Sequence, residues 1–484
     1  MRTLEDPELL QVRCIINGNL VGTPSLEVMN PSTGGVVARV PDLGAFEARS
    51  AVEAASGALS PWRSLTATQR GKILRGWHDL ILQHRSDLAT ILTSEQGKPR
   101  VEALAEIDYA ASYVEFYAEE AKRVQGEVLP APVASARTLV LRQPVGVVAA
   151  ITPWNFPAAM VTRKVAPALA AGCTVVLKPA PQTPLTALAL AGLALRAGIP
   201  AGVLNVVTGN AEAIGSVFTT HHAVRLLTFT GSTPVGKLLM QQCSSTVKKV
   251  LLELGGNAPF IVFNDADIDA AVDGAVASKF RNSGQTCVCA NRFYVQDEVH
   301  DEFVAKLAAK VRELRIGDGF ESLVTQGPLI DAQALLKVEK HVRDAVAHGA
   351  DVVVGGHRLG DSLFFEPTIL VGMRREMLIA NEETFGPVAA VFRFREDAEA
   401  IAAANDNPSG LAAYLYTSRL DRAFWAMESL EVGMVGINSG RMSTELAPFG
   451  GIKESGNSRE GSHHGILEFT ELKYCSIGGL RRAD

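Results

Sequence analysis

Short apolar runs alternate with helical stretches through the middle of this sequence, and this alternation constrains the fold more than any other feature. The runs at residues 145–151, 174–177, 203–207 and 226–230 are rich in β-branched residues and bounded by Gly, Pro, Asn or Thr. Such runs are typical of strands buried on both faces of a parallel sheet. A helical stretch at residues 183–197 ends at Gly198-Ile199-Pro200. The pattern predicts a parallel α/β unit.

A second alternation follows and predicts a second α/β unit. We expect strands at residues 259–263 and 292–295 and helices at residues 265–280 and 299–314. The first hundred residues are predicted to be mainly helical, and residues 100–124 form a long helix because Ala and Glu favour helix. Segments 125–142 and 467–477 are predicted to be edge strands, which can pair with another subunit.

Composition excludes several classes of function. A chain of 484 residues is long enough for about two to four domains. The net charge is −6 and the basic residues are dispersed, which argues against a nucleic-acid partner. No uninterrupted apolar stretch reaches the roughly 20 residues of a membrane helix, and the acidic N-terminus does not resemble a signal peptide. The six cysteines are thinly spread, so we expect no disulfide framework, no metal site and a cytoplasmic location.

Residues 231–237, Gly-Ser-Thr-Pro-Val-Gly-Lys, nearly match the phosphate-binding loop of nucleotide hydrolases. The match fails at Leu238, where a hydroxyl should bind magnesium, and Pro234 removes a backbone N–H. What remains is a predicted helix N-terminus that can bind a phosphate through its N–H groups. The same residues could equally form a plain strand-to-helix turn.

Three other positions carry chemically useful groups. Cys287 lies in a small, polar segment after a predicted helix, unlike most cysteines, which pack as small apolar residues. Glu253 precedes two glycines at the junction of the two units, where clefts form, and is a candidate base or a salt-bridged loop acid. Asn155 follows a buried strand between prolines and could donate an N–H to an oxyanion or belong to a turn.

Several motifs together resemble the aldehyde dehydrogenase superfamily over about residues 17–477. They are Trp154-Asn155-Phe156-Pro157, Lys178-Pro179-Ala180, Phe229-Thr230-Gly231-Ser232, Glu253-Leu254-Gly255-Gly256, Gly284-Gln285-Thr286-Cys287 and Glu383-Thr384-Phe385-Gly386-Pro387. Segments around Arg163, Arg281, Cys287 and Phe449 look most like succinate-semialdehyde dehydrogenases. The resemblance implies two Rossmann-like parallel-sheet α/β domains and a small β element for oligomerisation.

The resemblance also divides the chain and implies assembly. Residues 1–122 and 143–253 would bind the cofactor, residues 254–455 would form the catalytic domain, and segments 123–142 and 456–484 would join subunits into a homodimer or homotetramer.

The implied reaction is oxidation of a small aldehyde to a carboxylic acid. The Cys287 thiolate would attack the aldehyde carbon, and Asn155 with the Cys287 backbone N–H would hold the oxyanion. After hydride transfer to a nicotinamide cofactor, Glu253 would activate the water that hydrolyses the thioester. Lys178 completes the catalytic set that the resemblance implies.

The resemblance implies a nicotinamide cofactor held by residues from several segments. Lys178 would contact the adenosine ribose, Gly231 and Ser232 the pyrophosphate, and Glu383 the nicotinamide ribose. Many members that prefer NAD carry a Glu at the position of Pro181, and without that carboxylate we expect NADP to be accepted beside NAD. The whole expected set is Thr152, Trp154, Asn155, Lys178, Pro179, Ala180, Pro181, Gly209, Gly231, Ser232, Leu254, Glu383 and Phe385.

The substrate prediction depends on Arg163 and Arg281, which match arginines that bind the substrate carboxylate in succinate-semialdehyde dehydrogenases, with Ser443 adding a hydroxyl. A guanidinium can bind a carboxylate through two parallel hydrogen bonds, but either arginine could instead serve packing. Thr444 replaces an Asn of some relatives, which leaves the preferred chain length open. Cys289, two residues from Cys287, is a candidate for a reversible disulfide.

Other functions remain open alternatives. One is oxidation of another ω-carboxy aldehyde, such as glutarate or 2-oxoglutarate semialdehyde. A second is a non-catalytic nucleotide-binding protein with the same fold, because fold does not guarantee function. The third is an ATP hydrolase, which Leu238 disfavours.

Overall fold

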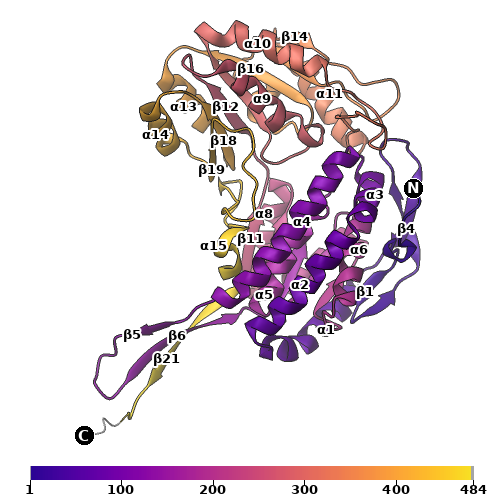
Figure 1. The fold of residues 1–484 in the computed structure, drawn as a ribbon, viewed down its shortest axis with the longest axis vertical. Helices are drawn as coiled ribbons and strands as arrows, with labels where there is room; N and C mark the ends of the chain where they lie inside the picture. Colours follow the sequence, from indigo (N-terminus) through magenta and orange to yellow (C-terminus); the bar gives the residue numbers. More distant parts are fainter. Residues whose placement is uncertain (1, 481–484) are drawn as a thin grey trace.

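Two seven-stranded sheets dominate the structure, a computed structural model that describes residues 2–480 (Figure 1). In the first sheet the five strands from β11 to β9 are parallel, while β1 and β2 add antiparallel strands at one edge. The order is β11 (Lys249–Glu253), β10 (Val224–Thr230), β7 (Val147–Ile151), β8 (Thr174–Lys178), β9 (Leu204–Val206), β1 (Cys14–Ile16) and β2 (Asn19–Val21).

Helices cover both faces of the first sheet. One face packs against α1 (Ala45–Ser64), α7 (Ala211–Thr220) and α8 (Thr233–Cys243). The other packs against α5 (Ala159–Ala171) and α6 (Pro184–Arg196), which are covered in turn by α2 (Ala67–Gln83), α3 (Arg85–Gln96) and α4 (Arg100–Glu120). Smaller elements complete the unit: the hairpin β3 (Pro24–Met29) and β4 (Val36–Pro41), and the short helices η1 (Pro7–Leu9), η2 (Ala121–Arg123) and η3 (Ser244–Thr246).

The second sheet is parallel except for its edge strand β14. Its order is β14 (Asp351–Val354), β15 (Thr368–Val371), β16 (Val388–Phe394), β13 (Ala290–Gln296), β12 (Ala258–Val262), β18 (Ala412–Tyr416) and β19 (Met434–Ile437). One face packs against α9 (Ile268–Lys279) and α10 (Asp297–Arg312). The other packs against α11 (Ala332–Ala347), α12 (Leu378–Asn381), α13 (Asp397–Asn405) and α14 (Leu420–Ser429). The short helix η4 (Arg281–Gly284) follows α9.

A three-stranded arm projects from the first unit (Figure 1). In it β6 (Arg137–Pro144) pairs on one side with β5 (Glu127–Leu129) and on the other with β21 (Thr470–Ile477). Before β21 the chain forms β20 (Ile452–Lys453), which pairs with β17 (Ser409–Gly410), and α15 (Ser462–Leu467), which packs against α4 and α5. Of the described part of the predicted assembly segment 456–484, β21 joins the arm as a strand, and the Leu480 N–H donates to the Ser135 carbonyl between β5 and β6 at 2.9 Å. Met1 and residues 481–484 lie outside the described residues.

The strands and helices expected from the alternation are confirmed, with ends shifted by a few residues. The expectation of a mainly helical first hundred residues holds from residue 45 onward, whereas residues 14–41 form β1 to β4. β1 and β2 have three residues each, too few for a period of two to mark them, whereas the burial of β3 does alternate along its six residues. The division of the chain into cofactor-binding and catalytic domains stays a prediction.

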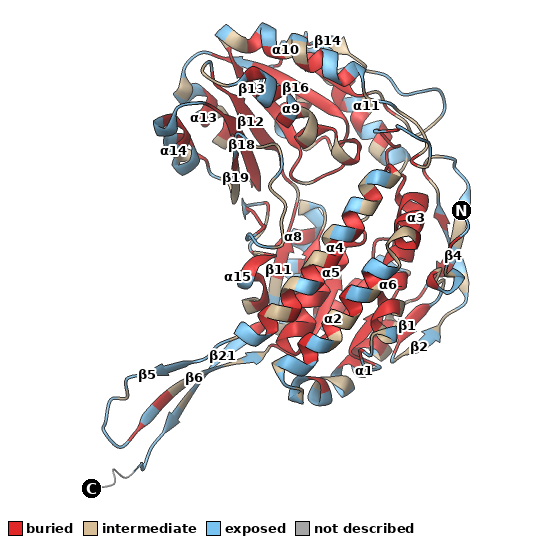
Figure 2. Ribbon diagram, viewed as in Figure 1, coloured by how far each residue is buried: buried red, intermediate tan, exposed pale blue. Residues whose placement is uncertain are grey.

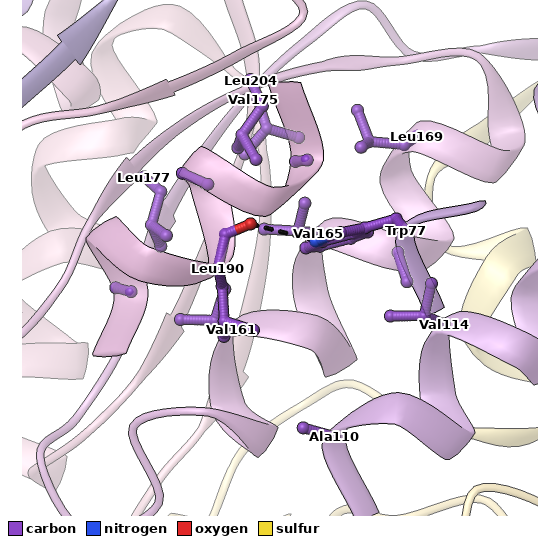
Figure 3. Close-up of a cluster of buried hydrophobic side chains, with 14 of the residues drawn as sticks. Trp77, Ala110, Val114, Val161, Val165, Leu169, Val175, Leu177, Leu190 and Leu204 are labelled. Carbon is purple, nitrogen blue, oxygen red and sulfur yellow. Dashed lines mark hydrogen bonds between the residues drawn. The ribbon is translucent and has the colours of Figure 1, made fainter. Parts of the chain in front are cut away.

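The interior of the first unit shows why its helices pack in two layers. Figure 2 shows the central strands of both sheets buried and much of the arm exposed. In Figure 3 the Trp77 ring of α2 lies among apolar side chains of α4, α5 and α6, and its Nε1 donates to the Leu190 carbonyl at 3.0 Å. This bond satisfies the polar atom of a fully buried indole. In the described chain no helix is long and apolar enough to cross a membrane.

Candidate active site

A cavity of about 530 Å³ lies where the ends of the first sheet's strands meet the second unit. Its wall includes many residues that the sequence predicts as catalytic or cofactor-binding, namely Trp154, Asn155, Gly231, Ser232, Glu253, Leu254, Cys287, Glu383 and Phe385. These residues come from segments up to about two hundred positions apart, so the fold brings the predicted set together at one edge of the first sheet.

The loop that carries Cys287 is held in an unusual backbone conformation. Asn282 and Ser283 have φ of +52° and +53°, and Gly284 has φ of +73°. A Cβ on Gly284 would lie 2.1 Å from the Gly386 carbonyl oxygen, so only glycine fits there. The Gln285 side chain accepts from the Ile330 N–H at 2.9 Å and donates to the Pro328 carbonyl at 3.2 Å. Strained backbone with so many partners is typical of a site that presents one side chain.

Asn155 lies beside this loop, just after β7. Its Nδ2 donates to the Gln285 carbonyl at 3.1 Å, and its Oδ1 is buried without a hydrogen-bond partner. An amide nitrogen has two hydrogens, so one remains free to donate to an oxygen in the cavity. The position suits a donor to an oxyanion that forms at Cys287.

Glu253 ends β11 and faces the cavity with both carboxylate oxygens buried and without a hydrogen-bond partner. Burial raises the pKa of Glu253 to about 7, against the opposing charge of Arg163. Burial, together with the negative charge of Glu253, also raises the pKa of the Cys287 thiol. The resting thiol is therefore protonated and needs a base, and Glu253 is a carboxyl that can take up and release a proton near neutral pH.

Glu383 and Phe385 approach the cavity from the second unit. Glu383 accepts the Gly256 N–H at 3.1 Å, and burial raises its pKa to about 7. The Phe385 ring meets the Trp154 ring edge to face, with centroids 5.4 Å apart. Between them Thr384 contacts the buried His341 of α11 at 3.2 Å. These contacts fix the loop against both units.

The segment that resembles a phosphate-binding loop does open a helix. Ser232 is the N-cap of α8, but its side chain makes no capping bond, and the Thr230 hydroxyl is buried without a partner. Glycine at position 231 leaves room for the Phe229 ring, because a Cβ there would lie 2.4 Å from that ring. Free N–H groups at a helix N-terminus beside a cavity are suited to a phosphate.

Some of the predicted cofactor residues lie away from the lining of this cavity. Lys178 ends β8, its Nζ lies 3.4 Å from the Pro179 carbonyl, and burial lowers its pKa to about 8. Thr152 and Ala180 are buried beside it and Pro181 is exposed. Gly209 has φ of +125° and a Cβ there would lie 2.2 Å from the Leu43 nitrogen, so packing alone explains this glycine. Their contacts with a cofactor stay predictions.

The two arginines predicted to bind the substrate have different surroundings. Arg163 is buried and its guanidinium binds the Glu460 carboxylate, so its donors already have a carboxylate partner from this chain. Arg281 is partly exposed, its Cζ lies 5.4 Å from the Phe156 ring centroid, and its guanidinium forms no ion pair within residues 2–480. Ser443 is partly exposed in the loop after β19. Within the described residues, Arg281 is therefore the one of the two arginines whose guanidinium is free to bind a substrate carboxylate.

Neither a metal site nor a disulfide is present in the described part of the chain. All six cysteines are free, and no group of His, Cys, Asp or Glu among residues 2–480 could hold a metal ion. Cys289 is buried and its Sγ lies 3.6 Å from the Lys279 carbonyl. Its redox role stays a prediction.

The comparison with known proteins decides the family. Residues 21–475 match the model of the aldehyde dehydrogenase family. The chain belongs to this family. It is 56% identical to the NADP(+) succinate-semialdehyde dehydrogenase of Escherichia coli strain K12, over 98% of this chain and 99% of that one. It is also 56% identical to the glutarate-semialdehyde dehydrogenase of Pseudomonas aeruginosa, over 99% of this chain and 100% of that one.

The solved structure of an aldehyde dehydrogenase from Brucella melitensis biovar abortus superposes with a TM-score of 0.98 at 56% identity, covering 99% of this chain and 100% of that one. The predicted fold class is confirmed: two parallel-sheet α/β units with additional small sheets.

The cavity of this aldehyde dehydrogenase also includes residues that the sequence analysis missed. Most come from one face of α11 and the turn before it, together with Met160 of α5 and Gln182 before α6; those of α11 and its turn are Ile330, Asp331, Gln333, Ala334 and Lys337. No motif marks α11, and its apolar period shows only which face packs on the sheet. Sequence reasoning had no signal for the part of α11 that faces the cavity.

Proposed function

We propose that this aldehyde dehydrogenase oxidises succinic semialdehyde to succinate and reduces NADP or NAD. The observation that carries the proposal is Arg281, a partly exposed guanidinium without an ion-pair partner within residues 2–480, six positions before Cys287. A guanidinium binds a carboxylate through two parallel hydrogen bonds. A substrate with a carboxylate at one end and an aldehyde at the other would be held at Arg281 and react at Cys287.

The first half of the reaction uses Glu253, Cys287 and Asn155. Glu253 takes the proton of the Cys287 thiol, and the thiolate sulfur forms a bond to the aldehyde carbon. The free N–H of the Asn155 amide donates to the resulting oxyanion. When bound, the nicotinamide cofactor supplies the acceptor for the hydride that leaves this carbon. The substrate carbon is then a thioester of Cys287.

The second half is hydrolysis of that thioester. Glu253, again ionised, takes a proton from a water molecule, whose oxygen attacks the thioester carbon. The carbon–sulfur bond breaks, the carboxylic acid leaves, and Cys287 recovers its proton. A carboxyl whose pKa is about 7 can serve in both halves near neutral pH.

The residues present suit a dinucleotide. Ser232 and the N-terminus of α8 would hold the pyrophosphate, and the unpartnered Thr230 hydroxyl lies in the same wall. Glu383, held by the Gly256 N–H, would accept hydrogen bonds from a ribose. Trp154 and Phe385 form the apolar side of the cavity.

The test of the substrate class is Arg281→Ala. We expect KM for succinic semialdehyde to rise at least tenfold while KM for butanal, an uncharged aldehyde of equal length, stays within about twofold, since a charged hydrogen-bonded contact contributes about 1.5–3 kcal/mol. Arg315→Ala is the control, because Arg315 is an exposed arginine in the loop after α10. Equal changes for both aldehydes would refute the role of Arg281.

A longer substrate, glutarate semialdehyde, is the second candidate. It is favoured by the equal identity to a relative with that name. Both aldehydes carry the terminal carboxylate that Arg281 would bind, so Arg281 does not separate them. Comparing kcat/KM for semialdehydes of four and five carbons does, and a higher value for the five-carbon aldehyde would replace succinic semialdehyde in the proposal.

For the cofactor we propose that NADP is accepted at least as well as NAD. Pro181 is exposed after β8 and carries no charge that would repel a 2′-phosphate. Pro181→Glu should lower kcat/KM with NADP and leave that with NAD nearly unchanged. A higher kcat/KM with NAD than with NADP in the natural chain would contradict the proposal.

We also propose a homodimer or homotetramer assembled through the arm. The exposed fractions of Val128 on β5 and of Leu472 and Tyr474 on β21 are 75%, 59% and 66%, so the three-stranded arm exposes large apolar surface. The measurement is the mass in solution by light scattering, and a monomer at micromolar concentration would contradict the proposal. A cytoplasmic location agrees with a mechanism that needs the Cys287 thiol reduced, and cell fractionation tests it.

A further inference from the structure

Lys98 is a fully buried lysine whose ammonium contacts the loop of Asn155. It lies in the short connection between α3 and α4, and its side chain is 0% exposed. Its Nζ donates to the Glu106 carboxylate at 2.6 Å and to the backbone carbonyl of Asn155 at 2.8 Å. The Phe156 ring centroid lies 4.1 Å from the same nitrogen. Lys98 therefore binds the backbone of the residue that the proposed mechanism uses as oxyanion donor.

Glu106 also binds the start of α5. Its other oxygen accepts the N–H groups of Ala158 and Ala159 at 2.9 and 3.3 Å. An acidic side chain at a helix N-terminus satisfies free N–H groups and interacts favourably with the helix dipole. The Lys98–Glu106 pair thus connects the backbone of Asn155 to the first turn of α5 and holds residues 155–159 at both ends.

The carbonyl and the side chain of Asn155 have separate hydrogen-bond partners. The carbonyl of Asn155 accepts from Lys98 and from Asn282 Nδ2 at 3.0 Å, while its own Nδ2 donates to the Gln285 carbonyl at 3.1 Å. With the peptide plane of Asn155 fixed, few rotamers of its side chain keep the bond to Gln285. The second N–H of the Asn155 amide therefore points in one direction. Loss of the Lys98 contact would leave that carbonyl held by Asn282 alone.

A role in stability alone explains the pair poorly. A fully buried ion pair gains little net stability compared with apolar side chains of the same volume. Its specific effect is geometric, because an ammonium has directed donors and an apolar side chain has none. We propose that Lys98, held by Glu106, is a positioning residue that aims the Asn155 amide at the oxyanion. This inference rests on the proposed role of Asn155.

The expected effect of Lys98→Met is a slower chemical step with little change in substrate binding. A misplacement of about 1 Å can cost about a hundredfold in rate, and loss of one oxyanion donor costs about a hundred- to a thousandfold. We therefore expect the rate of hydride transfer to fall about tenfold to a hundredfold, with KM for the aldehyde changed less than threefold.

The experiment is a double-mutant cycle of Lys98→Met and Asn155→Ala. Hydride transfer is followed in single turnovers with enzyme in excess, by the absorbance of the reduced cofactor. Each rate is divided by the fraction of sites that bind NADP in a titration, which removes the effect of unfolded protein. If Lys98 acts through Asn155, Lys98→Met should slow the natural chain but hardly slow Asn155→Ala further.

Two further variants keep the test decisive. Lys248→Met is the control, since Lys248 is another buried lysine whose Nζ, within residues 2–480, donates only to the carbonyls of Phe218 and His221. It should leave the rate per binding site unchanged. If Lys98→Met does not fold, Lys98→Met with Glu106→Gln removes the uncompensated charge and keeps an acceptor for Ala158.

The outcomes separate the two claims. The positioning role would be overturned if the rate losses of Lys98→Met and Asn155→Ala multiplied in the double variant, or if Lys98→Met had a normal rate per binding site. A normal rate in Asn155→Ala would instead overturn the proposed oxyanion donor itself.

Discussion

Glu253→Gln is expected to make the protein inactive and, at alkaline pH, more stable. Both oxygens of this carboxyl are buried without a hydrogen-bond partner, and burial raises its pKa from an ordinary 4.5 to about 7. An ionised group in such a place destabilises the folded chain, because water solvates the charge better in the unfolded chain. Glutamine has a similar shape and no charge, so it relieves this cost.

The size of the effect follows from the two pKa values. A carboxyl that titrates at 4.5 in the unfolded chain and at about 7 in the folded chain makes the ionised folded state about 3 kcal/mol less stable. The folded chain holds the proton more tightly, so stability decreases as pH rises from 4.5 to 7. The cost is absent below that range and complete above it.

The assay is the difference in melting temperature between variant and natural chain at pH 5 and at pH 8. One kcal/mol corresponds to about 2 °C for a unit of 150–250 residues, so the difference should grow by about 6 °C between the two pH values. Glu313→Gln, an exposed glutamate on the surface, should show no such growth. A difference that is equal at both pH values, or smaller at pH 8, would refute the reasoning.

Three more outcomes follow from the site. The kcat of the natural chain should rise through about pH 7 as Glu253 ionises, and a flat profile between pH 6 and 8 would contradict its role as base. Gly284→Ala should lose activity and soluble yield, since its φ is +73° and a carbonyl oxygen lies 2.1 Å from the added carbon, whereas Gly57→Ala in α1 should be harmless. Glu460→Gln should destabilise the fold by about 3–5 kcal/mol in a denaturant titration, because Arg163 and its neighbouring lysine are left buried without a counter-charge; an unchanged midpoint would contradict this.

Much of the architecture was predictable because it depends on local pattern. The buried strands β7, β8, β9, β10, β12 and β13 and the helices α6, α9 and α10 follow from apolar period and from Gly or Pro at their ends, whereas β11 was not predicted. The strands β1 to β4 escaped prediction. β1 and β2 have three residues each, too few for alternation to show, whereas β3 does alternate in its burial. Their pairing is set by distant residues, as for Ile15 beside Val206.

The candidate site was predictable only in part, and for a different reason. Motifs with Cys287, Glu253 and Asn155 suggested chemistry, and all three do line one cavity. Arg163 and Arg281 looked equivalent in the sequence. The fold brings Glu460, almost three hundred positions away, onto Arg163 and leaves Arg281 available.

The sequence by itself determined which residues can perform the chemistry and that the chain forms α/β units, because side-chain type and apolar period are local properties. The tertiary structure decided which charges are paired, which are buried and at what pKa they titrate. Those depend on neighbours that are distant in the chain, such as Asn155 and Lys98 or Glu253 and Arg163. Burial and electrostatics act through space, so only the folded chain determines them.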